Sequence, residues 1–124
     1  MNEVILCLGI ALFHESRGEP LKGQYAVAEV IHNRTKDSRF PDNHCYVIKQ
    51  KGQFSFYRSP KDLKPPKHEQ DAWNDSLKVA KDFYKKKTNY TKGSLYFNHQ
   101  RLGVRFKITN DIGKPIKYGN HVFF

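Results

Sequence analysis

The sequence contains little cysteine and few patterns that bind metals. Two cysteines among 124 residues are too few for the disulfide framework of a small secreted scaffold. No C-x-x-C pair occurs, and the H-E pair at 14–15 does not continue to an H-E-x-x-H zinc motif because residue 18 is glycine. We therefore expect no metal and no cofactor. Cys7 lies within an apolar run, which favours a buried free thiol.

Long hydrophobic segments are also scarce. The apolar run VILCLGIALF at residues 4–13 is too short to span a bilayer. Glu3 precedes it, where a signal peptide would carry positive charge, and charged residues follow it directly. We therefore expect a buried helix, in a protein with no transmembrane segment and no signal peptide of its own.

Negative charge is in short supply. Twelve acidic residues against 22 lysines and arginines leave a formal charge of +10. This excess suits an acidic partner, which leaves nucleic acid, an anionic membrane surface and the bacterial cell wall open. Hydrophobic residues at 38% and aromatic residues at 14% indicate a globular protein. The length is that of a single domain, spanning residues 1–124.

The spacing of apolar residues predicts helices in the first part of the chain. Residues 3–16 form the first helix, since Leu8, Leu12 and Glu15 follow at three- and four-residue steps. Gly18 suits the left-handed position that ends a helix, and Pro20 suits the first turn of a second helix over 20–34. The stretch HESRGEP at 14–20 is thus predicted to be a sharp helix–helix corner.

The remainder predicts a third helix and a small sheet. We expect a loop over 35–46, a return to the core at 47–48, and a short strand or extended segment over 52–59. A helix is expected over 69–87, with its inward side formed by Trp73, Leu77, Ala80, Phe83 and Tyr84. Short strands follow, with NDIG at 110–113 as a hairpin turn. The predicted fold class is α+β.

Two glutamates of the HESRGEP corner differ in their expected surroundings. Glu15 continues an apolar stripe, so partial burial should raise its pKa and favour a general acid. The alternative is a helix-end carboxylate paired with Arg17 or Arg34. Glu19 precedes Pro20 at the start of a helix, where a negative charge is stabilised, so capping or an ion pair with an arginine is its expected role.

The chain resembles a known family in several ordered blocks. HESRGEP, followed by GQ-x-AVAEVIHNR, resembles the opening signature of the cell-wall hydrolases typified by spore cortex-lytic enzymes. The similarity continues through FP-x3-C-x-VI at 40–48, QFS at 53–55, YFN at 96–98 and GNHVFF at 119–124. The blocks span nearly the whole chain. The first is highly specific, whereas QFS or YFN alone is weak.

The resemblance implies a small lysozyme-like single domain with an α+β fold, in which Glu15 is the catalytic residue. It further implies substrate-binding or supporting roles for Glu19, Gln53, Ser55, Tyr96, Asn98 and His121. For Gln53 and Ser55 the alternative is that Phe54 packs inward and its neighbours only satisfy backbone groups. Members of the family often carry a tryptophan between the YFN and histidine blocks. Here that stretch, residues 99–117, has Phe106 as its only large aromatic residue. Phe124 stands where tyrosine is common.

The activity that this resemblance implies is cleavage of peptidoglycan glycan strands between N-acetylmuramic acid and N-acetylglucosamine. Asp42 is a weak candidate for a second carboxylate, so a single-glutamate lytic transglycosylase or muramidase mechanism is favoured. We expect a monomer without cofactor, encoded by a bacteriophage as an endolysin that accumulates in the host cytoplasm before pore-assisted release. The alternative is a basic nucleic-acid-binding protein without enzymatic activity; a wall-binding module without catalysis is third.

Overall fold

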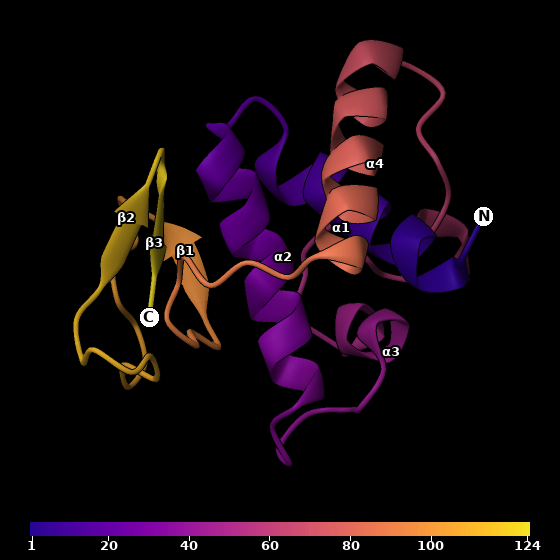
Figure 1. Ribbon diagram of the computed structural model, residues 1–124. Coiled ribbons are helices and arrows are strands. Elements are labelled where there is room, and N and C mark those ends of the chain that lie inside the picture. The colour runs from indigo at the N-terminus through magenta and orange to yellow at the C-terminus, as the bar shows by residue number, and fades with distance from the viewer.

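The computed structural model describes all residues from 1 to 124 and contains helices on one side and a small sheet on the other (Figure 1). The helices are α1 (Glu3–Ser16), α2 (Leu21–Thr35), α3 (His44–Lys49) and α4 (Gln70–Lys85), with a 3₁₀ turn at Pro60–Asp62. The strands are β1 (Phe97–His99), β2 (Ile116–Tyr118) and β3 (His121–Phe123). Helix α2 lies between the sheet and the α1–α4 pair. The α+β prediction is confirmed.

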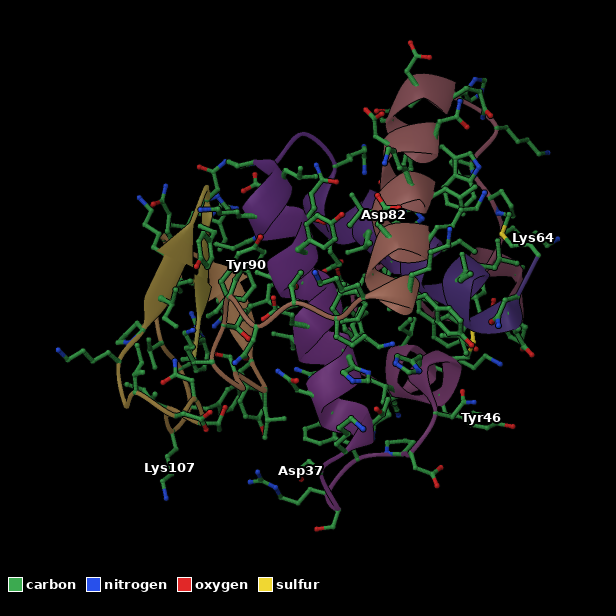
Figure 2. All side chains as sticks on the ribbon, viewed as in Figure 1. Asp37, Tyr46, Lys64, Asp82, Tyr90 and Lys107 are labelled. Atoms are coloured by element: carbon green, nitrogen blue, oxygen red, sulfur yellow. A yellow bond between two sulfur atoms is a disulfide. The ribbon has the colours of Figure 1, made fainter.

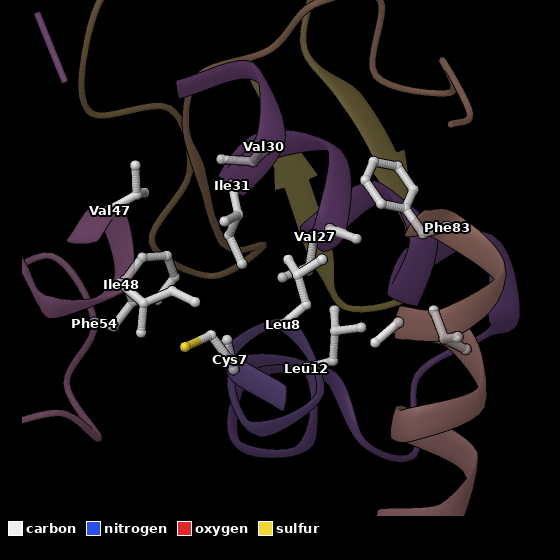
Figure 3. Packing of buried hydrophobic residues seen from close by; sticks show 14 of the residues in the cluster. Cys7, Leu8, Leu12, Val27, Val30, Ile31, Val47, Ile48, Phe54 and Phe83 are labelled. Atoms are coloured by element: carbon white, nitrogen blue, oxygen red, sulfur yellow. The ribbon is translucent and has the colours of Figure 1, made fainter. Parts of the chain in front are cut away.

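Helix α1 is the centre of the helical half. The side chain of Asn2 caps its first turn by accepting a hydrogen bond from the Val4 backbone. Seven consecutive residues, Cys7 to Phe13, are buried, because α2, α3 and α4 all pack against this helix. A helix that is apolar on all sides needs such a surrounding. Figure 3 shows Leu8 and Leu12 of α1 facing Val27 of α2 and Phe83 of α4.

The corner between α1 and α2 forms as the sequence predicts. Gly18 has a φ of +82°, which a residue without a Cβ adopts at little cost. Pro20 is the residue that precedes α2 rather than a member of its first turn. Helix α2 therefore begins one residue later than expected, at Leu21.

Helix α4 confirms the third predicted helix, with one exception on its inward side. Trp73, Ala80 and Phe83 are buried, and Leu77 is half-buried. The prediction for Tyr84 is wrong, since 40% of this residue is exposed. It follows Phe83 by one position, which turns it about 100° around the helix, and its hydroxyl accepts a hydrogen bond from Asn2.

Two expectations for the middle of the chain are wrong. Residues 44–46, predicted as loop, belong to α3, which the Asn43 side chain caps by accepting from the Tyr46 backbone. A six-residue helix is too short to show a helical period. Residues 52–59 form turns and bends instead of a strand, while Phe54 among them reaches the core.

The two cysteines form a disulfide, so the prediction of a buried free thiol at Cys7 is wrong. Cys7 of α1 and Cys45 of α3 are bonded, with their Cα atoms 5.5 Å apart. They are separated by 38 positions in the sequence, so no local pattern indicates that α3 brings the second cysteine against α1. Burial of Cys7 itself is confirmed.

The sheet is antiparallel and has the order β1-β3-β2. Strand β3 lies in the middle, with His121 opposite His99 of β1 and Tyr118 of β2. Residues 110–113 do form a turn, but it precedes β2 and does not join two paired strands. The hairpin turn is Gly119–Asn120, between β2 and β3. A Cβ at Gly119 would lie 2.5 Å from a carboxylate oxygen of Glu19, so the approach of the α1–α2 corner requires glycine there.

None of the helices combines the length and the apolarity that crossing a membrane requires.

Candidate active site

A cavity of about 420 Å³ opens between the helices and the sheet. Its wall is formed by the last turns of α1 and α2, the 52–55 segment, β1 with the residues after it, and the start of β3. The lining residues are Glu15, Arg34, Gly52, Gln53, Phe54, Ser55, Phe97, Asn98, His99, Leu102 and His121. Five residues predicted from the sequence thus converge on one site: Glu15, Gln53, Ser55, Asn98 and His121.

Glu15 lies in the last turn of α1 and is half-buried, with no hydrogen bond or ion pair within the protein. The ion-pair alternative is wrong for both arginines. Arg17 turns away to bind Glu69, 3.1 Å from its carboxylate, and Arg34 donates to the Leu95 carbonyl. Burial therefore acts on an unpaired carboxyl, and it raises the pKa of Glu15 from 4.5 to about 7. Near neutral pH a substantial fraction of Glu15 is protonated.

Glu15 is also the only carboxylate that lines the cavity. Asp42, the weak candidate for a second acid, is exposed in the loop before α3 and does not line it. Glu19 lies outside as well. The site therefore presents one titratable acid to a bound molecule.

Arg34 is a site residue that sequence reasoning missed except as an ion-pair partner. It is only 4% exposed, and its Nε donates to the Leu95 carbonyl at 2.8 Å. The guanidinium also lies about 5 Å from the ring centres of three aromatic residues, Phe40, Phe54 and Tyr96. Burial lowers the pKa of Arg34 to about 10, so it stays positive at neutral pH. The sequence signal that could have identified Arg34 as a site residue is its position in the HNR segment at 32–34, which belongs to the first family block.

The 52–55 segment presents its polar side chains at the cavity while its aromatic residue packs inward. Phe54 is buried in the core, as the structural alternative supposed, but Gln53 and Ser55 are exposed and both line the cavity. Gln53 accepts a hydrogen bond from Arg34 over 3.3 Å. The buried arginine thereby helps to orient this amide toward the cavity.

Tyr96 lies outside the cavity and makes no hydrogen bond to Glu15. Its ring stacks against Phe124 and contacts the exposed Phe106, with centres 5.9 and 5.2 Å apart. Because the Tyr96 ring also lies against the Arg34 guanidinium, its contribution is to hold this arginine in place. Asn98, two residues on, does reach the cavity and donates to the Gly103 carbonyl.

His121 and Glu19 are linked through the β2–β3 hairpin. Glu19 accepts two hydrogen bonds from Asn120, one from its backbone nitrogen at 2.8 Å and one from its side chain at 3.0 Å. The expected arginine partner is wrong, and the hairpin takes its place. Glu19 thus holds the residue directly before His121, across 101 positions of sequence.

His121 is only 8% exposed, and its Nδ1 is buried without a hydrogen-bond partner. Its ring meets Phe97 edge-on, with centres 5.3 Å apart. Burial lowers the pKa of His121; Glu19 opposes this shift and His99 adds to it. At neutral pH the imidazole is therefore uncharged and can accept or donate one hydrogen bond toward the cavity.

Glu29 is a further glutamate whose role was not predicted. It is 2% exposed, and its carboxylate accepts hydrogen bonds from the Thr88 hydroxyl and from the backbones of Tyr90 and Thr91. These bonds tie α2 to the segment that leads into β1. Because its oxygens are occupied, Glu29 has a structural role and Glu15 remains the free acid.

The structure contains no group of three or more His, Cys, Asp or Glu side chains placed to hold a metal ion.

Three comparisons connect this geometry to known proteins. The catalytic domain of the germination-specific lytic transglycosylase SleB from Bacillus anthracis is similar over 99% of this chain and 94% of that domain, with 27% identity and a TM-score of 0.73. The SleB catalytic domain of Bacillus cereus is similar over 97% and 88%, with 25% identity and a TM-score of 0.55. Neither supports the nucleic-acid-binding alternative.

Sequence comparison gives a local match and a family match. A spore cortex-lytic enzyme of Halalkalibacterium halodurans is 55% identical over 38 residues, which are 31% of this chain and only 12% of that enzyme. The model of the family described as Cell Wall Hydrolase matches residues 18–124. The chain therefore belongs to the Cell Wall Hydrolase family.

Proposed function

We propose that this protein cleaves the glycan strand of peptidoglycan between N-acetylmuramic acid and N-acetylglucosamine, with Glu15 as its single acid and base. The observation that carries the proposal is the unpaired, half-buried Glu15 with a pKa of about 7, the only carboxylate lining the cavity. A carboxyl group that is protonated near neutral pH can donate its proton to a glycosidic oxygen. The family membership and the similarity to SleB support the substrate.

The number of carboxylates favours a lytic transglycosylase over a hydrolase. Retaining and inverting glycosidases place a second carboxylate about 5 to 9.5 Å from the first, and this cavity has none. In the proposed reaction Glu15 gives its proton to the leaving oxygen as the glycosidic bond breaks. The resulting carboxylate takes the proton of the muramic C6 hydroxyl, whose oxygen bonds to C1 and closes a 1,6-anhydro ring. Glu15 is then protonated again.

The other side chains of the cavity bind and orient the glycan in this proposal. Gln53, Ser55 and Asn98 offer amide and hydroxyl groups that suit the N-acetyl and hydroxyl groups of a sugar. His121 offers a neutral imidazole. Arg34 holds Gln53 in place and supplies the positive charge of the site.

The biological setting is a further part of the proposal. We propose a monomeric bacteriophage endolysin that accumulates in the host cytoplasm and reaches the wall through a separate pore-former. The formal charge of +10 supports attraction to an anionic cell wall. Sedimentation of the purified protein tests the monomer, and lysis of host cells only after permeabilisation tests the need for a pore.

Mass spectrometry of fragments released from purified sacculi tests the reaction. The proposed mechanism yields muropeptides that end in 1,6-anhydro-muramic acid and are lighter by one water than hydrolysed products. Glu15→Gln should release neither kind, whereas Asp42→Asn, which removes an exposed carboxylate outside the cavity, should match the wild type. Hydrolysed products alone would refute the single-glutamate ring closure. Tight DNA binding without any wall cleavage would favour the nucleic-acid-binding alternative.

A further inference from the structure

A second cavity adjoins the one that holds Glu15. It has a volume of about 580 Å³ and is lined by Lys49, Lys51, Gly52, Phe54, Ser55, Tyr57 and Arg58. Gly52, Phe54 and Ser55 line both cavities. The two cavities therefore share part of their wall, and their openings are neighbours along the 52–55 segment.

The second cavity is basic and contains no carboxylate. Lys49, Lys51 and Arg58 line it, and none of them forms an ion pair with an acidic residue. Lys49 instead lies 5.3 Å from the ring centre of Tyr46. Asp62 is the acidic residue near Arg58, and its carboxylate is occupied by the backbone N–H groups of Arg58 and Ser59. These cations are thus available to an anionic ligand.

We infer that this basic cavity binds the peptide stem of peptidoglycan through the stem's free carboxylates. The inference rests on the proposed function, because it takes the glycan to lie in the cavity of Glu15. In peptidoglycan the stem is attached to the lactyl group of muramic acid, which is the sugar whose bond would be cleaved. A stem leaving that sugar starts beside Glu15, and the adjoining cavity offers three cations together with the Tyr57 ring.

A stem explains the position of these charges better than a phosphate polymer of the wall does. A separate anionic polymer has no covalent reason to lie next to the scissile bond, whereas the stem does. The distinction can be measured, since the stem can be removed from the glycan enzymatically. The inference therefore makes a claim about substrate choice: this enzyme prefers glycan strands that carry peptide stems.

The decisive experiment compares two substrates and two charge variants. The substrates are intact sacculi and the same sacculi after an amidase has removed the stems. The test variant is Lys51→Gln/Arg58→Gln. The control is Lys36→Gln/Lys107→Gln, which makes the same change in charge in a separate cavity of about 450 Å³ that shares no residue with the first. Figure 2 shows Lys107 on the sheet side of the molecule and Tyr46 of α3 on the opposite side.

The test variant should raise KM on intact sacculi on the order of 2- to 30-fold at low salt, as expected for two exposed ion pairs. This increase in KM should be smaller at high salt, and it should be absent on stem-free strands. The control should change KM on the two substrates by equal factors. The inference would be overturned if the test variant raised KM by the same factor on both substrates. It would also be overturned if the control raised KM as much as the test variant does, and only on intact sacculi.

A binding measurement separates this inference from the proposed function. In Glu15→Gln, the amide NMR signals of Gly52, Tyr57 and Arg58 should shift on addition of an isolated stem peptide, but not with a peptide whose carboxylates are amidated. Absence of shifts refutes the stem site even if the glycan is cleaved. Shifts with a glycerol-phosphate polymer but not with the stem would assign the cavity to phosphate instead. Failure of the wild type to cleave either substrate refutes the proposed function alone.

Discussion

Glu15→Gln should abolish activity and at the same time make the protein more stable. The carboxyl group is half-buried with no internal partner, and its pKa rises from 4.5 to about 7. A shift of this size corresponds to about 3 kcal/mol, since one pKa unit is about 1.4 kcal/mol. The cost falls on the charged form in the folded state. Glutamine has nearly the same shape and carries no charge, so the variant avoids this cost.

The sign of the effect fixes its pH dependence. Below pH 4.5 Glu15 is protonated in both the folded and the unfolded chain, so wild type and variant should be equally stable with respect to this group. Between pH 4.5 and 7 the unfolded chain loses the proton first, and the folded wild type becomes progressively less stable. Above pH 7 the free energy of unfolding of the variant should exceed that of the wild type by about 3 kcal/mol. This corresponds to a Tm difference on the order of 10 °C.

Urea unfolding of both proteins at pH 4, 6 and 8, with turbidity loss of purified walls at pH 6, measures this prediction. Asp42→Asn serves as the control, because Asp42 is exposed and lies outside the cavity. A stability difference that does not grow with pH would refute the argument from desolvation. A folded Glu15→Gln with more than a few per cent of wild-type activity would refute the catalytic assignment.

Three other perturbations have defined outcomes. Glu19→Gln removes one of the two carboxylate oxygens that accept hydrogen bonds from Asn120. Thermal melts should show a free energy of unfolding lower by about 1 to 2 kcal/mol, and activity should follow the folded fraction. A fully folded, inactive variant would contradict this. The Cys7–Cys45 disulfide links residues that are 38 positions apart and so closes a loop of that length. Its reduction should lower the free energy of unfolding by about 4 kcal/mol, and an unchanged thermal melt would contradict this. His32 is stacked on His44, and its pKa is lowered to about 4 mainly by burial. The unfolded chain therefore binds this proton more readily, and the contribution of His32 to stability should fall between pH 6.5 and 4. His32→Asn should gain stability relative to the wild type as the pH drops through this range, and a difference that does not change with pH would exclude this residue as the cause.

Local patterns by themselves predicted helices α1, α2 and α4 and placed Glu15 on a buried stripe. The bounds of α1 follow from apolar steps of three and four residues, and the same steps place Glu15 on the buried side. The corner at Gly18 and Pro20 follows from the φ angles that these two residues favour. Each of these features depends on neighbours within about one or two helical turns, which a linear sequence displays directly.

The tertiary structure decided which residues meet and which remain free. Glu15 is a free acid only because Arg17 and Arg34 bind other groups, and Glu19 binds a hairpin 101 positions away. The disulfide likewise joins α1 to α3. Such pairings depend on how the helices and the sheet pack together, and no spacing within the sequence encodes them. The partial burial of Glu15 was therefore visible in the sequence, whereas the absence of an ion-pair partner was set by the packing.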